Sequence, residues 1–136
     1  MRITLQQLRE LDAGKRQLLA FEKTFGQEVD LTEEVCVRHA DTFHWPWMLD
    51  TFVSVADFTA RGGVVAVEAA EVFNGELIAA AVEQYHLDCA EADTNGDDDG
   101  YRKAIADLRY REACAIADKA HNESLAMIFA CVSRLS

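Results

Sequence analysis

Three groups of residues in this 136-residue chain have side chains and spacings that could do chemistry. The first is the loop Asn95-x-Asp97-x-Asp99-Gly100, which matches the early ligand positions and the glycine of an EF-hand-like calcium loop. The twelfth position holds Ala106, where such a loop needs a bidentate glutamate. We therefore interpret the segment as an acidic turn, with weak calcium binding as the alternative.

The second group is a mirrored pair, Cys36-x-x-His39 and His86-x-x-Cys89. Residues three apart lie on one side of a helix, so two such helices facing each other could supply a tetrahedral zinc site. The spacing differs from common zinc motifs, and Cys89 belongs to an apolar helical stripe. Helix packing is the favoured interpretation, and we predict no metal and no cofactor.

The third group is Cys36 as a nucleophile with His39 as its base. No third group that would orient the base is evident, and the chain has no Gly-x-Ser-x-Gly elbow, phosphate-binding glycine loop or His-Glu-x-x-His motif. The run His44-Trp45-Pro46-Trp47 could line a ligand pocket, although tryptophans beside a helix start are more often core or interface anchors. We predict that the protein is not an enzyme and has no catalytic residues.

The elements of the first half follow from capping signals. Thr4 with Gln7 predicts a short helix to about Leu11, and Thr32 predicts the start of another. Between them, a helix carrying Leu18, Phe21 and Phe25 should stop at Gly26, with 28–31 briefly extended. Pro46 should open a helix that runs to Gly62-Gly63.

The second half shows longer helical patterns. Asn74-Gly75 should split its first apolar region, because a straight helix from Val64 to Ala92 would have no consistent apolar face. After Gly75 a buried stripe is expected at Ile78, Val82, Tyr85, Cys89 and Ala92. A polar loop should cover 93–100. From Tyr101 the chain should be helical to its end, with a break near 121–124 and a last stripe of Leu125, Ile128, Phe129 and Val132.

These patterns predict an all-α fold, because the alternation of β-branched residues that marks strands is almost absent. The length suits one compact bundle of about five to seven helices. Within the single domain 1–136 we distinguish an N-terminal module (1–61), an acidic segment (62–100) and a C-terminal helical region (101–136). The predicted core comprises Phe21, Phe25, Ile78, Val82, Tyr85, Leu125, Ile128 and Phe129.

The chain is strongly acidic, and most of its excess charge lies in one segment. There are 13 Lys and Arg against 24 Asp and Glu, a net charge of −11. Residues 62–100 carry ten acidic side chains and no Lys or Arg, which leaves the rest of the chain nearly neutral. This charge opposes direct binding to nucleic acid or to an anionic membrane.

Such a segment is either a solvated surface or a surface that recognises a basic partner. If it recognises a partner, the candidate contact residues are Glu68, Glu71, Glu76, Glu83, Glu91, Asp97, Asp98 and Asp99.

The sequence predicts neither a secretory signal peptide nor a membrane-spanning helix. The start is polar by its fourth residue, and the longest apolar runs, at 64–67 and 77–82, are far shorter than the ~18–20 residues that span a bilayer. We therefore expect a cytoplasmic protein, in which all four cysteines are free thiols.

Two parts of the chain resemble small proteins encoded by tailed phages and prophages. The run Phe21-Glu-Lys-Thr-Phe-Gly26, with the residues up to Trp47, is similar to their N-terminal module. The motifs Tyr101-Arg-Lys-Ala104 and Tyr110-Arg-Glu-Ala113 resemble their Tyr-x-Lys-Ala helical repeats. The sequence departs from the family at His44 and in its middle third. The resemblance implies a phage context and brings no catalytic residues.

Together these features predict a phage-encoded, anti-CRISPR-like binding protein in the host cytoplasm. It would stoichiometrically inhibit a host nucleic-acid-processing defence complex by occupying a basic nucleic-acid-binding surface. The alternative is a structural or assembly protein of a phage or prophage that associates with itself as a homo-oligomer.

Overall fold

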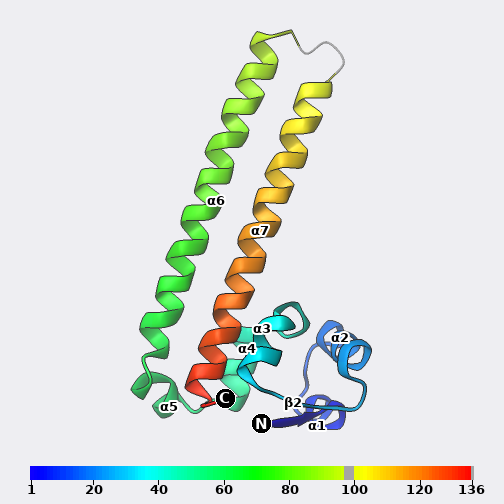
Figure 1. The fold of residues 1–136 in the computed structure, drawn as a ribbon, viewed down its shortest axis with the longest axis vertical. Helices are drawn as coiled ribbons and strands as arrows, with labels where there is room; N and C mark the ends of the chain where they lie inside the picture. The colour runs from blue at the N-terminus through cyan, green and yellow to red at the C-terminus, as the bar shows by residue number, and fades with distance from the viewer. Residues whose placement is uncertain (97–99, 136) are drawn as a thin grey trace. The chain divides into compact units, whose positions relative to one another are not determined.

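The computed structural model describes residues 1–96 and 100–135 (Figure 1). These residues form seven α-helices, one 3₁₀ turn and one two-stranded sheet, which confirms the predicted all-α fold class. Contacts divide the chain into two units, residues 1–68 with 122–135, and residues 69–121.

Unit 1 begins with a small antiparallel sheet. Strand β1 (Arg2–Thr4) pairs with β2 (Glu28–Asp30), so that Ile3 lies opposite Val29. The extended segment at β2 was predicted and is confirmed, whereas β1 was not predicted. Three residues are too few to show a strand's alternation, and Ile3 becomes fully buried only through its long-range pairing.

Two predicted threonine caps and one glycine stop in unit 1 are confirmed. Helix α1 (Leu5–Glu10) begins where the Thr4 hydroxyl accepts the backbone N–H of Gln7 at 3.0 Å. Helix α3 (Glu33–Arg38) begins in the same way at Thr32. Helix α2 (Lys15–Phe25) ends at Gly26, whose φ of 75° lies in a region that glycine adopts readily.

The predicted helix from Pro46 to Gly62 is wrong in one respect, because it is two helices. After a 3₁₀ turn (Ala40–Thr42), α4 runs over Trp45–Phe52 and α5 over Val55–Ala60. Between them the Ser54 hydroxyl accepts the backbone N–H of Asp57 at 3.1 Å and caps α5. Serine is a preferred N-cap, so it starts a new helix here and does not continue the old one.

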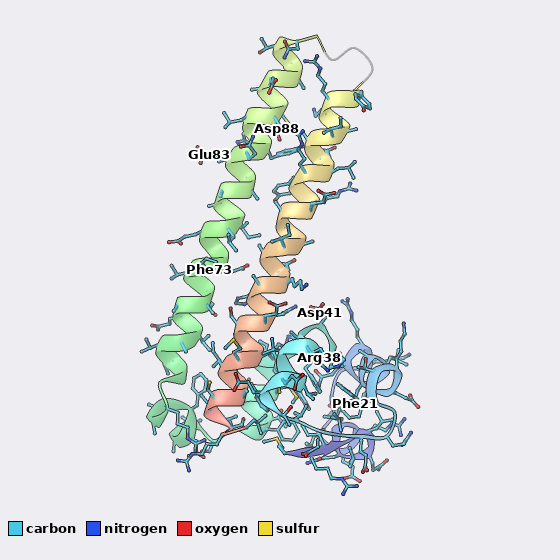
Figure 2. The ribbon with its side chains drawn as sticks, in the orientation of Figure 1. Phe21, Arg38, Asp41, Phe73, Glu83 and Asp88 are labelled. Atoms are coloured by element: carbon cyan, nitrogen blue, oxygen red, sulfur yellow. The ribbon has the colours of Figure 1, made fainter. Side chains whose placement is uncertain are left out.

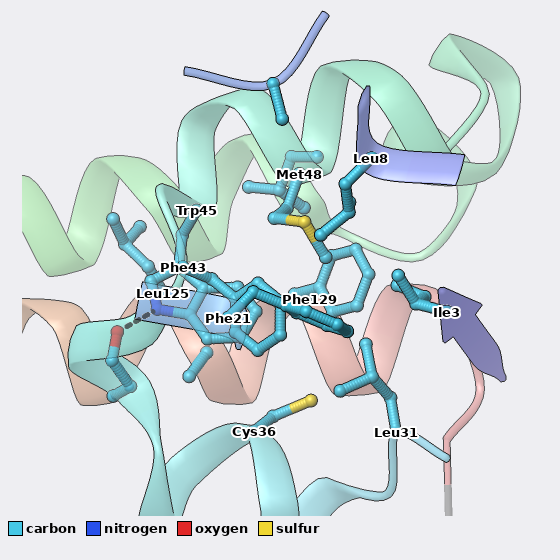
Figure 3. Close-up of a cluster of buried hydrophobic side chains, with 14 of the residues drawn as sticks. Ile3, Leu8, Phe21, Leu31, Cys36, Phe43, Trp45, Met48, Leu125 and Phe129 are labelled. Carbon is cyan, nitrogen blue, oxygen red and sulfur yellow. Dashed lines mark hydrogen bonds between the residues drawn. The ribbon is translucent and has the colours of Figure 1, made fainter. Parts of the chain in front are cut away.

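The core of unit 1 is built around aromatic rings (Figure 3). Trp45 is buried and donates its indole N–H to the Ala40 carbonyl at 2.8 Å. Its ring centroid lies 5.2 Å from that of Phe43 and 5.5 Å from that of Phe129. Among the predicted core residues of this unit, Phe21, Leu125 and Phe129 are buried, and Phe25 and Ile128 are partly buried against them.

Two long helices make up most of the described part of unit 2. Helix α6 spans Gly63–Thr94 and α7 spans Tyr101–Val132, and residues 69–94 of α6 and 101–121 of α7 belong to this unit. The breaks predicted at Asn74-Gly75 and near 121–124 are therefore wrong. The predicted stripe has the correct phase, since Ala92 is buried and Ile78, Val82, Tyr85 and Cys89 are half-buried.

The seam between the two helices repeats every eleven residues. On α6, buried alanines stand at Ala70, Ala81 and Ala92, and on α7 at Ala106 and Ala117. An eleven-residue repeat corresponds to about 3.67 residues per turn, close to the helical 3.6, so the alanines of each helix stay on nearly the same side. Alanine also lets backbones approach closely. The break was predicted because Val72, Phe73 and Leu87 are apolar but exposed, so the apolar residues of this segment do not share one face.

Candidate functional site

Five of the eight predicted acidic contact residues lie on α6. Glu68, Glu71, Glu76, Glu83 and Glu91 are all exposed, and α6 contains no Lys or Arg. Within unit 2, Glu76, Glu83 and Glu91 fall within an arc of about 80° and along about 22 Å of helix, at 3.6 residues per turn and a 1.5 Å rise. The structure thus brings these three carboxylates onto one face. The remaining candidates, Asp97, Asp98 and Asp99, lie outside the described residues.

One acidic residue of α6 does not belong to this surface. The side chain of Asp88 is only 11% exposed and faces α7 (Figure 2). One of its oxygens accepts the Gln84 side-chain amide at 3.0 Å and lies 3.9 Å from the Arg109 guanidinium. Asp88 therefore contributes to the contact between α6 and α7 and not to the exposed acidic surface.

Exposed apolar side chains share the outer face of α6 with the glutamates. Val72, Phe73 and Leu87 are 62%, 51% and 58% exposed. Figure 2 shows Phe73 and Glu83 on the side of α6 away from α7. We call this surface, defined by Val72, Phe73, Glu76, Glu83, Leu87 and Glu91, the outer α6 face. The apolar half of this surface was not predicted, although Leu87 lies outside the predicted buried stripe.

Polar contacts hold the two helices of unit 2 in register. The Tyr85 hydroxyl donates to the Asp107 carboxylate at 2.7 Å, and the Tyr85 ring lies 5.1 Å from that of Tyr110. The hydrogen bond to Asp107 is the main reason that the pKa of Tyr85 is raised, and the hydrogen bond with Cys114 likewise raises the pKa of Tyr110. Both phenols therefore stay protonated. Because Tyr85 contacts Asp107 and Tyr110 of α7, this side of α6 faces α7 and the outer α6 face lies on the opposite side.

The arrangement around Cys36 works against thiolate chemistry. Cys36 is fully buried, and burial raises the pKa of its thiol to about 11. The ring of His39 packs edge-on against Phe25 with centroids 5.0 Å apart. No hydrogen bond joins Cys36 to His39 among the contacts of the described residues. A buried, protonated thiol is a poor nucleophile.

The zinc and calcium alternatives involve different parts of the chain. Within residues 1–96 and 100–135, no three His, Cys, Asp or Glu side chains converge in a way that could hold a metal ion. Cys36 and His39 belong to unit 1, whereas His86 and Cys89 belong to unit 2. The calcium alternative depends on Asp97 and Asp99 and lies outside the described part of the chain.

Comparisons with known proteins add no relative. The chain matches no family model, no curated protein and no solved structure. The resemblance to phage proteins therefore stays a prediction.

Hydropathy gives one further finding about the long helices. In the part of the chain that the structure describes, no helix is long and apolar enough to cross a membrane.

Proposed function

We propose that the protein is a non-catalytic binding protein whose outer α6 face occupies a basic surface of a nucleic-acid-binding complex. The observation that carries the proposal is the alignment of Glu76, Glu83 and Glu91 on one exposed helix face, in a helix without a single Lys or Arg. A field of one sign attracts a basic groove and raises the rate of association with it.

The resemblance of its N-terminal module and Tyr-x-Lys-Ala motifs to phage proteins supplies the biological setting of the proposal. A phage protein that covers a nucleic-acid channel would protect phage DNA or RNA from host defence. We therefore propose an anti-CRISPR-like inhibitor that acts stoichiometrically in the host cytoplasm and competes with nucleic acid for the channel.

The apolar side chains of the outer α6 face indicate that its partner has an apolar surface as well as a basic one. Phosphates are recognised by charge, so a groove that binds only phosphates gives Phe73 and Leu87 nothing to contact. We expect a partner surface on which basic side chains surround an apolar depression. In such an interface the charges act mainly on the association rate, and the buried apolar anchors slow dissociation.

Self-association is the second candidate, and exposed residues of α7 favour it. Leu108 and Ile116 are both exposed, and Arg111 lies on the same helix. A second copy could place this surface against the acidic and apolar outer α6 face. The protein would then be an assembly component, and a second copy of the chain would cover the outer α6 face.

Capture from bacterial lysate tests the first candidate. The baits are the wild-type protein, a triple reversal of Glu76, Glu83 and Glu91 to Lys, and a control triple reversal of Glu10, Glu22 and Asp50 to Lys. The control makes the same change in net charge, and its three residues are exposed and lie near the C-terminal ends of α1, α2 and α4, where Lys is tolerated.

We expect wild type and control to capture the same nucleic-acid-binding protein, and the Glu76/Glu83/Glu91 reversal to lose it. Capture of that protein should fall when DNA or RNA is added. Equal capture by all three baits would refute a role for the outer α6 face. A wild-type protein that recovers only further copies of itself would establish the second candidate.

A further inference from the structure

Unit 1 contains a hollow of about 530 Å³ that the proposed function does not use. It lies at the start of α2, beside the 3₁₀ turn and the start of α4, and Asn122 of α7 closes one side. Volumes of ~300–1,000 Å³ are typical of small-molecule sites. The run His44-Trp45-Pro46-Trp47 is divided here, since Trp45 is in the core while His44 and Trp47 line the hollow.

Opposite charges line this hollow without pairing. Arg16 and Asp41 are both lining residues, and neither forms an ion pair with another described residue. The Asp41 carboxylate accepts the Asn122 side-chain amide at 3.2 Å through one oxygen, which holds it in place. A ligand with both a negative and a positive group could satisfy the two walls together.

A buried amide in the lining has unused donor capacity. Gln17 is only 7% exposed, and its side-chain oxygen accepts the backbone N–H of His44 at 2.8 Å. Its amide nitrogen has a single contact, the Met48 sulfur at 3.8 Å. An amide nitrogen has two donors and a thioether is a weak acceptor, so Gln17 can still donate to an oxygen.

The hollow also has a flat apolar wall. Trp47 is half-buried, and its ring contacts Phe52 with centroids 6.0 Å apart. A partly exposed tryptophan ring beside polar groups is a surface on which another flat group can stack.

We propose that this hollow binds a free amino acid with a flat apolar side chain. The carboxylate of the amino acid meets the Arg16 guanidinium and the Gln17 amide at the start of α2. Its ammonium meets Asp41, and its side chain stacks against Trp47. No bond is made or broken, so the ligand acts as an effector or a structural ligand and not as a substrate.

Titration calorimetry with L-tryptophan, L-phenylalanine and L-tyrosine tests the proposal on the intact protein. We expect saturable binding of at least one of them at a stoichiometry of one. N-acetyl-L-tryptophan lacks the ammonium and L-tryptophanamide lacks the carboxylate. Each should bind about tenfold or more weakly than L-tryptophan, because each leaves one charged wall unpaired.

Two charge variants assign the groups. Arg16→Gln should bind L-tryptophan and its amide equally, and Asp41→Asn should bind L-tryptophan and its N-acetyl derivative equally. Lys15→Gln is the matched control, because Lys15 is an exposed neighbour on the same helix turn that does not line the hollow. It should keep the full preference for L-tryptophan.

A further variant separates binding from folding. Gly14 is the N-cap of α2, makes no side-chain cap, and has open space where a Cβ would stand. Gly14→Asp should raise the melting temperature, because aspartate is a good N-cap, and should weaken amino-acid binding, because its carboxylate occupies the same region.

Two results would overturn the proposal. One is the absence of saturable binding by any of the three amino acids up to about 5 mM. The other is binding that Arg16→Gln and Lys15→Gln leave equally unchanged.

Discussion

Two residues that the sequence predicts to be in the core differ sharply in burial. Phe129 is fully buried among the rings of unit 1, whereas Ile78 is only half-buried in the seam of unit 2. We expect Phe129→Ala to cost about 3–5 kcal/mol of the free energy of unfolding, and Ile78→Ala about 1–2 kcal/mol. Urea denaturation of the two variants measures this difference. Equal losses would contradict the burial described for the seam.

The thiol of Cys36 predicts a pH dependence of stability. The folded state raises its pKa to about 11, while an unfolded chain ionises a cysteine near about 8.5. Between these values the unfolded state binds fewer protons, so the free energy of unfolding should fall as the pH rises, by at most about 1.4 kcal/mol per pH unit.

Denaturation at pH 8, 9 and 10 tests this dependence with Cys36→Ala and with Cys131→Ala, whose cysteine is exposed. Cys36→Ala should flatten the decline with pH, and Cys131→Ala should keep it. The same slope in all three proteins would show that Cys36 does not titrate as described.

At the scale of the element, Gly75 tests the continuity of α6. It lies inside the helix and is exposed, and a Cβ atom added there would meet open space. Gly75→Ala should therefore stabilise the protein by about 0.5–1 kcal/mol, because alanine favours the helix. Gly26→Ala, at a φ of 75°, should destabilise it instead.

Thermal unfolding monitored by circular dichroism at 222 nm measures both glycine variants. A Gly75→Ala protein less stable than wild type would restore the predicted turn at Asn74-Gly75.

Local sequence signals were sufficient to predict helix ends that depend on contacts between residues close in the sequence. Thr4, Thr32 and Gly26 were predicted to begin or end helices, and they do so through contacts within a few residues. Strand β1 was missed because its pairing depends on a partner that is distant in the sequence, with Ile3 opposite Val29. The unbroken α6 was missed because small alanines mark its seam while larger apolar residues such as Val72 and Phe73 are exposed, so the segment shows no single apolar face.

At the scale of the whole molecule, the acidic half of the outer α6 face was predicted from the sequence, whereas its apolar half was only partly predictable. The segment without Lys or Arg is plain in the sequence, and the helical period aligns Glu76 with Glu83. Leu87 lies outside the predicted buried stripe, whereas Phe73 precedes the predicted break and could be placed on the same face only once α6 was known to be continuous. The hollow in unit 1 joins residues as distant as Arg16 and Asn122, which no local pattern connects.

The exposed apolar residues of the outer α6 face should control how long the complex lasts. Phe73→Ser should shorten the lifetime of the complex about tenfold or more while leaving the association rate within about twofold, because an apolar anchor acts after encounter. Leu19→Ser is the control, since Leu19 is also exposed but lies on α2. Surface plasmon resonance with the captured partner measures both rates. Equal dissociation rates for the two variants would remove Phe73 from the interface.

The most direct test of the account is the association rate constant of the protein with its captured partner, measured between low and high salt. Wild type and the Glu10/Glu22/Asp50 reversal should associate fast at low salt and slow steeply as salt screens the field. The Glu76/Glu83/Glu91 reversal should associate at least about tenfold more slowly at low salt and show little salt dependence. Association of that reversal as fast as wild type, with the same salt dependence, would contradict the claim that the outer α6 face is the binding surface.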